Sequence, residues 1–430
     1  MKTSGSRFAC RPLLIAAAVL AVLPRTSADD RMRWKFDFGP GDAAPGYTQV
    51  LPNHVYTPES GFGFEPETPV TGVDRGGTNA LQRDFCTSGA PFYFSVDVPE
   101  GNYRVTVVLG DSKGQSTNTI KAELRRLMLE NVRTGNGEIV SRTFAVNVRT
   151  AAIPGGGEVK LKERERTTEM RNWDRKLTLE FNGTRPCVCA VEIESAPEIP
   201  TVFVLGDSTV CDQPLEPWNS WGQMLPRFFG PDVAIANHAQ SGESLKSSLG
   251  AHRLDKVLSA MKSGDYLFVQ YGHNDMKDKA TNALAVYETN LKRFVDGARQ
   301  KGGMPVLVTS MERKAGRDQP TLGDYPDTVR RIAKEENVPL IDLNVMSVQL
   351  YRALGSERID RAFQDGTHHN NYGSYELAKC VVQGIKASHL VLANHLASGF
   401  SSFDPSKPDS IETFDIPPSP ESSQAKPLGN

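Results

Sequence analysis

The pattern of apolar residues changes abruptly near residue 197. From residue 33 to about 197, apolar and polar residues alternate in short runs that are separated by turns rich in Gly and Pro. Such runs are typical of half-buried strands, and their number predicts an all-β sandwich. After the segment APEIP (residues 196–200), short apolar strands alternate with longer helical stretches. This alternation predicts βαβ units with a parallel sheet that is covered by helices on both faces.

We therefore expect two folded domains in the 430-residue chain. Residues 29–197 are predicted to form the β-sandwich, and residues 198–398 a flavodoxin-like three-layer α/β domain. The strands expected in the second domain are 201–205, 233–236, 266–271, 305–309 and 339–342, and its helices 245–261, 283–301, 327–336 and 372 to about 396. Residues 119–131 fit a helix or a bent strand equally well. Residues 399–430 are rich in Ser and Pro with few apolar residues, which predicts a disordered tail.

The first 28 residues have the order of a secretory signal peptide. Basic residues precede an apolar run over residues 13–23, and small residues follow before Asp29. This pattern predicts cleavage after Ala28 and a secreted or periplasmic protein. An uncleaved membrane anchor is the alternative, although the run is short for a bilayer. Cys10 lies in this segment, so five of the six cysteines remain, and at least one of them must stay unpaired or pair between chains.

Composition excludes several classes of partner. The net charge is −2, whereas nucleic-acid binding usually requires a basic excess, so we expect no nucleic-acid partner. The sequence has no pair of CxxC motifs and no His cluster, so no metal site is predicted. We expect no membrane association once the signal peptide has been removed, and the oligomeric state stays open.

A serine follows the first strand of the predicted α/β domain, in the segment Gly206-Asp207-Ser208-Thr209. Ligand sites in open parallel sheets form beyond the carboxyl ends of the strands. Ser208 at such a turn presents its Oγ together with its own N–H, which suits a nucleophile. The alternative is that Ser208 only caps the next helix.

Three more segments place polar residues or a glycine at the same edge. Asn274 follows the third strand and can donate to an oxyanion, or can simply form a turn. Asp365 precedes His368 by three residues, which lets the carboxylate orient the ring as a base; a surface pair at a helix start is the alternative. Gly242 follows the second strand and allows a backbone N–H to approach a substrate. Each signal is weak alone, but together they supply a nucleophile, a base and an oxyanion donor.

The segments GDSTV (206–210), QYGHND (270–275) and DGTHHNNYG (365–373), with the glycine after the second strand, resemble the four blocks of SGNH (GDSL-type) hydrolases. Over about residues 200–395 the chain is most similar to the rhamnogalacturonan acetylesterases within that superfamily. The resemblance implies a serine esterase that needs no cofactor and no metal. It assigns Ser208 as nucleophile, His368 as base and Asp365 as orienting acid, with an oxyanion hole made by Ser208, Gly242 and Asn274.

The function we expect is a secreted esterase that removes acetyl groups from a plant-type polysaccharide such as pectin or rhamnogalacturonan. The alternatives are a lipase or thioesterase with the same residues, and a non-catalytic glycan-binding protein. Trp218 and His273 are candidates for substrate contact, each with a packing or turn role as the alternative. His369 is a rival for His368 as the base. The β-sandwich resembles galactose-binding-like modules, and its role is either glycan binding or purely structural.

Overall fold

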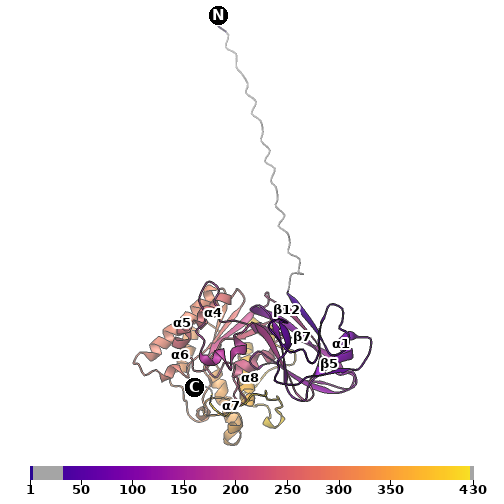
Figure 1. The fold of residues 1–430 in the computed structure, drawn as a ribbon. Coiled ribbons are helices and arrows are strands. Elements are labelled where there is room, and N and C mark those ends of the chain that lie inside the picture. Colours follow the sequence, from indigo (N-terminus) through magenta and orange to yellow (C-terminus); the bar gives the residue numbers. More distant parts are fainter. Residues whose placement is uncertain (3–31, 427–430) are drawn as a thin grey trace.

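The structure is a computed structural model that describes residues 1–2 and 32–426. A β-rich domain and an α/β domain lie side by side in it (Figure 1). The expected signal peptide falls almost entirely outside the described residues. The predicted fold class is confirmed, because the N-terminal half is all-β apart from short helical turns and the C-terminal half is a helix-covered parallel sheet.

The described part of the β-rich domain is built on two sheets that enclose one core. The first has the order β10-β7-β12-β1-β2, with β5 pairing β12 and β4 pairing β5; the second has the order β3-β6-β11-β8-β9. Aromatic side chains fill the space between them, and Phe38 and Phe94 have ring centroids 4.8 Å apart. The elements are β1 (Arg33–Phe38), β2 (Thr48–Val50), β3 (Phe62–Phe64), β4 (Thr71–Asp74), α1 (Ala80–Arg83), β5 (Asp84–Thr87), β6 (Phe92–Asp97), β7 (Gly101–Gly110), β8 (Ser116–Ala122), β9 (Arg126–Thr134), β10 (Ile139–Val148), β11 (Lys176–Asn182) and β12 (Cys187–Ser195).

The open question about residues 119–131 is resolved in favour of strands. Strands β8 and β9 form a hairpin whose turn contains Glu123 and Arg125, both with positive φ (55° and 62°). This turn also contacts the second domain, because Gln223 of that domain donates a hydrogen bond to the carbonyl of Leu124 at 2.9 Å. The hairpin is therefore part of the interface between the two domains.

The sheet of the second domain is parallel throughout and has the order β14-β13-β15-β16-β17. Numbered within the domain this is 2-1-3-4-5, the flavodoxin-like order, whose topological switch point lies between the first and third strands. The switch point here lies between β13 and β15. The strands are β13 (Thr201–Gly206), β14 (Ala234–Asn237), β15 (Tyr266–Gln270), β16 (Met304–Val308) and β17 (Leu340–Ile341).

Successive apolar residues of these strands face opposite layers of helices. Val202 and Val204 pack with α2, α7 and α8, whereas Phe203 and Leu205 pack with α3 to α6. Figure 1 shows α4, α5 and α6 grouped on one side of this domain and α7 and α8 on another. The predicted helix over residues 245–261 is divided at His252, which has a φ of 61°. Helix α7 was not predicted. The helices are α2 (Trp221–Met224), α3 (Leu245–Gly250), α4 (Arg253–Ala260), α5 (Ala283–Gln300), α6 (Tyr325–Glu335), α7 (Leu343–Arg358) and α8 (Asn371–Ala387).

The prediction of a disordered tail is wrong for residues 399–426, which we call the C-terminal segment. Phe403 and Ile416 are buried in the core of the α/β domain. Further along, Lys121 of the β-rich domain donates to the carbonyl of Pro417 at 2.9 Å and to Ser419 at 2.7 Å. Only a few apolar residues of this segment are buried, and polar contacts, several of them to its backbone, supply many of its other interactions. Because such contacts leave no apolar pattern in the sequence, the composition of the segment resembles that of a disordered chain.

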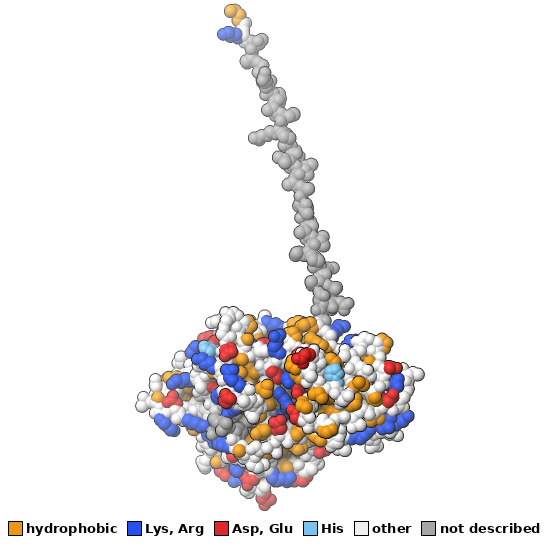
Figure 2. Space-filling model, in the orientation of Figure 1, with side chains coloured by type: hydrophobic (Ala, Val, Ile, Leu, Met, Phe, Trp, Pro, Cys, Tyr) orange, Lys and Arg blue, Asp and Glu red, His pale blue; other side chains and the backbone are white. Residues whose placement is uncertain are grey.

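Figure 2 shows acidic and basic side chains interspersed over the face in view. The five cysteines in residues 32–426 are buried and unpaired. The described helices include none that is long and apolar enough to cross a membrane. In the same part of the chain, no group of His, Cys, Asp and Glu is arranged to hold a metal ion.

Candidate active site

The segment that follows β13, which we call the nucleophile loop (residues 206–213), lies at the switch point of the sheet. A Cβ on Gly206 would come within 2.6 Å of the Val210 side chain and 2.8 Å of the Gln270 carbonyl, so only glycine fits there. Asp207 stabilises the turn that follows by accepting from the Thr209 N–H at 2.9 Å and hydroxyl at 2.7 Å. The loop thereby presents Ser208 beyond the end of the strand.

Ser208, His368 and Asp365 come together from opposite ends of the α/β domain. The Ser208 Oγ lies 2.9 Å from His368 Nε2, and His368 Nδ1 lies 2.9 Å from Asp365 Oδ2. Ser208 and His368 are 3% and 4% exposed. An alcohol, an imidazole and a carboxylate in this order can transfer the serine proton to the ring while the acid fixes the ring's tautomer.

The Asp365 carboxylate is strongly held in its ionised form. Burial raises its pKa, but hydrogen bonds from the His368 ring and from the backbone N–H groups of His368 and Thr367 outweigh that effect. Both N–H groups donate to Oδ1 at 2.6 Å. The pKa of Asp365 is therefore well below its usual value, which suits a residue that must remain an anion beside an imidazole.

His369 occupies a different environment from His368. Its Nε2 lies 3.0 Å from the Tyr351 hydroxyl, and its ring packs on Phe363 with the centroids 4.0 Å apart. Burial, followed by the nearby histidines, lowers the pKa of His369 to about 3. His369 is a neutral core residue whose Nε2 is already hydrogen-bonded to Tyr351. The structure therefore favours His368 over His369 as the base.

The predicted oxyanion donors Ser208, Gly242 and Asn274 lie on the loops that follow β13, β14 and β15. Among the described residues, none accepts a hydrogen bond from the backbone N–H of Ser208 or of Gly242. Gly242 has a φ of 77°, a conformation that favours glycine. Asn274 donates one amide hydrogen to the Glu243 carbonyl at 2.9 Å, which leaves its second hydrogen available.

Of the two roles that the sequence leaves open for Trp218 and His273, the structure favours packing over substrate contact. Trp218 is 3% exposed, donates its indole N–H to the Ser423 carbonyl at 3.0 Å, and lies edge-on to His368 with ring centroids 5.8 Å apart. Trp218 therefore packs between the His368 ring and the C-terminal segment. His273 is also buried: its ring nitrogens lie 3.3 Å from Asp207 and 3.0 Å from the Met311 carbonyl.

The site also rests on residues of the β-rich domain that sequence reasoning missed. Arg126 of the β8–β9 hairpin pairs with Asp212 at 2.7 Å, and Arg125 donates to the Gln213 carbonyl at 2.9 Å. Gln213 in turn donates to the carbonyl of Ser208 at 2.9 Å. Residues 160–173 of the β-rich domain, which we call the charged loop, also contact the candidate site. Its dense run of charges, KLKERER, was the one available signal, but such a run normally marks a solvated surface.

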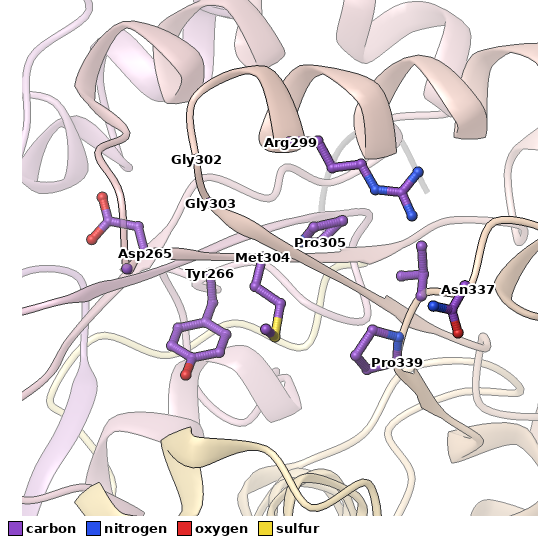
Figure 3. A pocket seen from close by; sticks show the side chains of 11 residues that line it. Asp265, Tyr266, Arg299, Gly302, Gly303, Met304, Pro305, Asn337 and Pro339 are labelled. Atoms are coloured by element: carbon purple, nitrogen blue, oxygen red, sulfur yellow. The ribbon is translucent and has the colours of Figure 1, made fainter.

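A cavity of about 310 Å³ lies elsewhere, at the amino ends of β15 and β16 (Figure 3). Asp265, Tyr266, Met304 and Pro305 line it, together with Pro339 before β17. Because substrates of open parallel sheets bind beyond the carboxyl ends of the strands, this cavity is separate from the candidate site.

Comparison with known proteins agrees with both halves of the fold. Residues 204–374 match the GDSL-like lipase/acylhydrolase family, and residues 34–148 match the β-agarase/YXIM esterase-like, galactose-binding domain-like family. The rhamnogalacturonan acetylesterase RhgT of Bacillus subtilis is 39% identical over 46% of this chain and 94% of its own length. The uncharacterised esterase YxiM of Bacillus subtilis is 28% identical over 82% of this chain and 90% of its own length. A crystal structure of YxiM covers 84% of this chain and 99% of that one, with 26% identity and a TM-score of 0.46.

The fold, the two family matches and the similarity to RhgT define an SGNH hydrolase, that is, a carboxylic ester hydrolase. The chain belongs to the GDSL-like lipase/acylhydrolase family and carries a galactose-binding-like domain in front of the hydrolase domain. Its relatives include rhamnogalacturonan acetylesterases.

Proposed function

We propose that this protein is an exported acetylesterase that removes acetyl groups from a plant-type polysaccharide, with pectin or rhamnogalacturonan as the substrate class. The observation that carries the proposal is the line of Ser208, His368 and Asp365, in which each hydrogen-bonded pair of atoms is 2.9 Å apart. Export is inferred from the basic residues and the apolar run that precede Asp29.

In the proposed mechanism, His368 takes the Ser208 proton as Oγ attacks the acetyl carbonyl. Negative charge develops on the carbonyl oxygen, where the N–H groups of Ser208 and Gly242 and the amide of Asn274 stabilise it. The C–O bond to the sugar breaks, and His368 donates its proton to the departing alcohol. A water molecule, deprotonated by His368, then attacks the acetyl-enzyme and releases acetate and free Ser208.

Two features support a small acyl group and a sugar substrate. Ser208 and His368 are almost fully buried, and Trp218 closes one side of the ring. A long acyl chain needs an open apolar channel at the nucleophile, whereas an acetyl group does not. The name of the relative RhgT gives rhamnogalacturonan as the substrate of that protein, and on this ground we place pectic polysaccharides first among the candidates.

The test is acetate release from acetylated pectin, rhamnogalacturonan, xylan and mannan by the purified protein. We expect the fastest release from rhamnogalacturonan or pectin, and none with the Ser208→Ala variant. Equal or faster release from xylan would contradict the pectic assignment. A marked preference for long-chain acyl esters of a small alcohol would instead favour the lipase or thioesterase alternative.

Export has its own test. N-terminal sequencing of the exported protein should give a sequence that begins at Asp29; an unprocessed N-terminus would contradict the cleavage site.

A further inference from the structure

The charged loop of the β-rich domain lies directly against the segment that carries Gly242. Lys162 donates to the carbonyl of Ser241 at 2.7 Å, and Arg164 donates to the same oxygen. The Ser241 residue is completely buried, and the Arg164 side chain is 10% exposed. Two cationic side chains from one domain therefore converge on a single backbone carbonyl of the other.

That carbonyl belongs to the same peptide group as the Gly242 N–H. The peptide bond between Ser241 and Gly242 is trans, so its C=O and N–H point in opposite directions in one plane. Hydrogen bonds from cations are stronger than those between neutral groups, and polarisation passes along a hydrogen-bonded chain. Electron density drawn toward the Ser241 oxygen makes the Gly242 N–H more positive and a better donor.

The preceding peptide group is held as well. Ser241 donates its own N–H to the Gln240 side-chain oxygen at 2.8 Å, and the Gln240 amide donates to Glu169 at 2.6 Å. Glu169 lies on the charged loop and pairs with Arg164 at 3.3 Å. The β-rich domain thus contacts the Ser241 carbonyl directly, and it contacts the Ser241 N–H through Gln240.

The charged loop is itself fixed on the α/β domain. Arg253 of helix α4 donates to both carboxylate oxygens of Glu165, at 3.0 and 2.7 Å, and both side chains are almost fully buried. Lys162 also pairs with Glu243 at 2.7 Å, on the far side of Gly242. The bidentate, buried Arg253–Glu165 ion pair keeps the loop from moving away from the site, which preorganises the contact with Ser241.

We propose that Lys162 and Arg164 of the β-rich domain are positioning residues of the oxyanion hole: they orient and polarise the peptide group whose N–H, at Gly242, donates a hydrogen bond to the oxygen that becomes negatively charged. The inference rests on the proposed function, in which Gly242 is an oxyanion donor. It gives the β-rich domain a part in the chemistry, in addition to any role in binding glycan.

The test compares kcat and KM for hydrolysis of p-nitrophenyl acetate in Lys162→Met, Arg164→Gln and the double variant. We expect kcat to fall about 10-fold in each single variant, less than the ~10²- to 10³-fold loss of a direct oxyanion donor, and roughly 100-fold in the double variant, at the lower end of that range. KM should change little, because the ground-state carbonyl carries little charge. Lys162→Arg keeps the cation and should retain most of the activity.

Arg166→Gln is the matched control, since Arg166 lies on the same loop but is exposed and pairs with the exposed Glu158 at 3.7 Å. A second measurement is inhibition by phenylboronic acid, which forms a tetrahedral, negatively charged adduct with a nucleophilic serine. We expect its inhibition constant to rise in proportion to the fall in kcat, an effect that a merely structural role would not produce.

The outcomes separate this inference from the proposed function. If Ser208→Ala is inactive but the folded double variant keeps the wild-type kcat and boronate affinity, the positioning role is wrong. If kcat falls but the affinity for the boronate is unchanged, the residues act only on folding or substrate access, which also overturns the inference. If Ser208→Ala retains activity, the proposed function itself fails.

Discussion

The Asp365 carboxylate accepts two different hydrogen bonds from His368, one from ring Nδ1 to Oδ2 at 2.9 Å and one from the backbone N–H to Oδ1 at 2.6 Å. A single side chain thus fixes both the position of the loop and the direction of the ring. We expect Asp365→Asn to keep the backbone contact, because the amide oxygen still accepts, while losing the carboxylate that selects the tautomer. The kcat for acetate release should fall about 10³- to 10⁴-fold.

Asp360→Asn is the control for that measurement, since Asp360 is exposed and pairs only with Lys314 among its described neighbours, at 3.0 Å. Its activity should equal that of the wild type. A folded Asp365→Asn enzyme with activity within a few-fold of wild type would show that the carboxylate does not orient the base.

The adjacent histidines should respond differently to substitution. His368→Ala removes the proposed base, so we expect acetate release from the folded variant to fall at least ~10³-fold. His369→Gln leaves the site intact but disturbs a buried ring packed on Tyr351 and Phe363. It should lower the free energy of unfolding by about 1 to 3 kcal/mol while the folded enzyme keeps most of its activity. Measuring both quantities in both variants checks the assignment, and the reverse pattern would make His369 the base.

The C-terminal segment should contribute measurable stability through Ser419. Its hydroxyl lies 2.7 Å from Lys121 Nζ and 2.7 Å from Glu180, and its N–H donates to Glu216 at 2.9 Å. These charged side chains are buried at the domain interface. Ser419→Ala leaves Lys121 and Glu180 with one partner fewer, while the backbone contact to Glu216 remains. The substitution should cost about 1 to 3 kcal/mol, seen as a lower midpoint of urea unfolding.

Ser406→Ala provides the comparison in the same segment, because Ser406 is exposed and its hydroxyl contacts only Asp404 among the described residues. We expect its unfolding midpoint to stay within error of the wild type. Equal effects of the two substitutions would mean that the C-terminal segment is not held at Ser419.

Asp275 should make stability depend on pH. Burial raises its pKa to about 7; the Leu245 N–H, which donates at 2.9 Å, opposes this rise, and the charge of Asp207 adds to it. Between about pH 4 and pH 7 the folded state holds a proton that the unfolded state has lost, so Asp275 stabilises the fold at low pH and this contribution is lost as the pH rises through 7.

Asp275→Asn keeps the acceptor for Leu245 and cannot ionise. Relative to wild type, its free energy of unfolding should increase from pH 5 to pH 8 by up to about 3 kcal/mol, then stay constant. Urea unfolding of both proteins at each pH measures this difference. A difference that does not change with pH would contradict the raised pKa.

The parts of the fold and site that follow from local pattern could be predicted from the sequence. Alternating apolar runs define the β-rich domain, and the strands ending at Gly206 and Gln270 place Ser208 and Asn274 at one edge of the sheet, because parallel strands share that edge. The spacing of Asp365 and His368 made their contact geometrically simple. These features repeat at fixed intervals or lie close together in the chain.

The parts that depend on contacts between distant segments could not be predicted. Ion pairs such as Arg253–Glu165 and Arg126–Asp212 join residues more than 80 positions apart and have no periodic signature. The burial of Trp218 depends on the C-terminal segment, which forms no regular helix or strand there and therefore has no recognisable sequence pattern. Helix α7 was missed because its apolar residues do not repeat clearly enough to separate it from the loop around it.

The most direct test of the account is covalent labelling of the protein with a fluorophosphonate, followed by peptide mapping and an acetate-release assay. The account predicts one phosphonyl group per chain, attached to Ser208, with complete loss of acetate release, and no labelling or activity in Ser208→Ala. A label at another residue, or acetate release that persists after Ser208 has been modified, would contradict it.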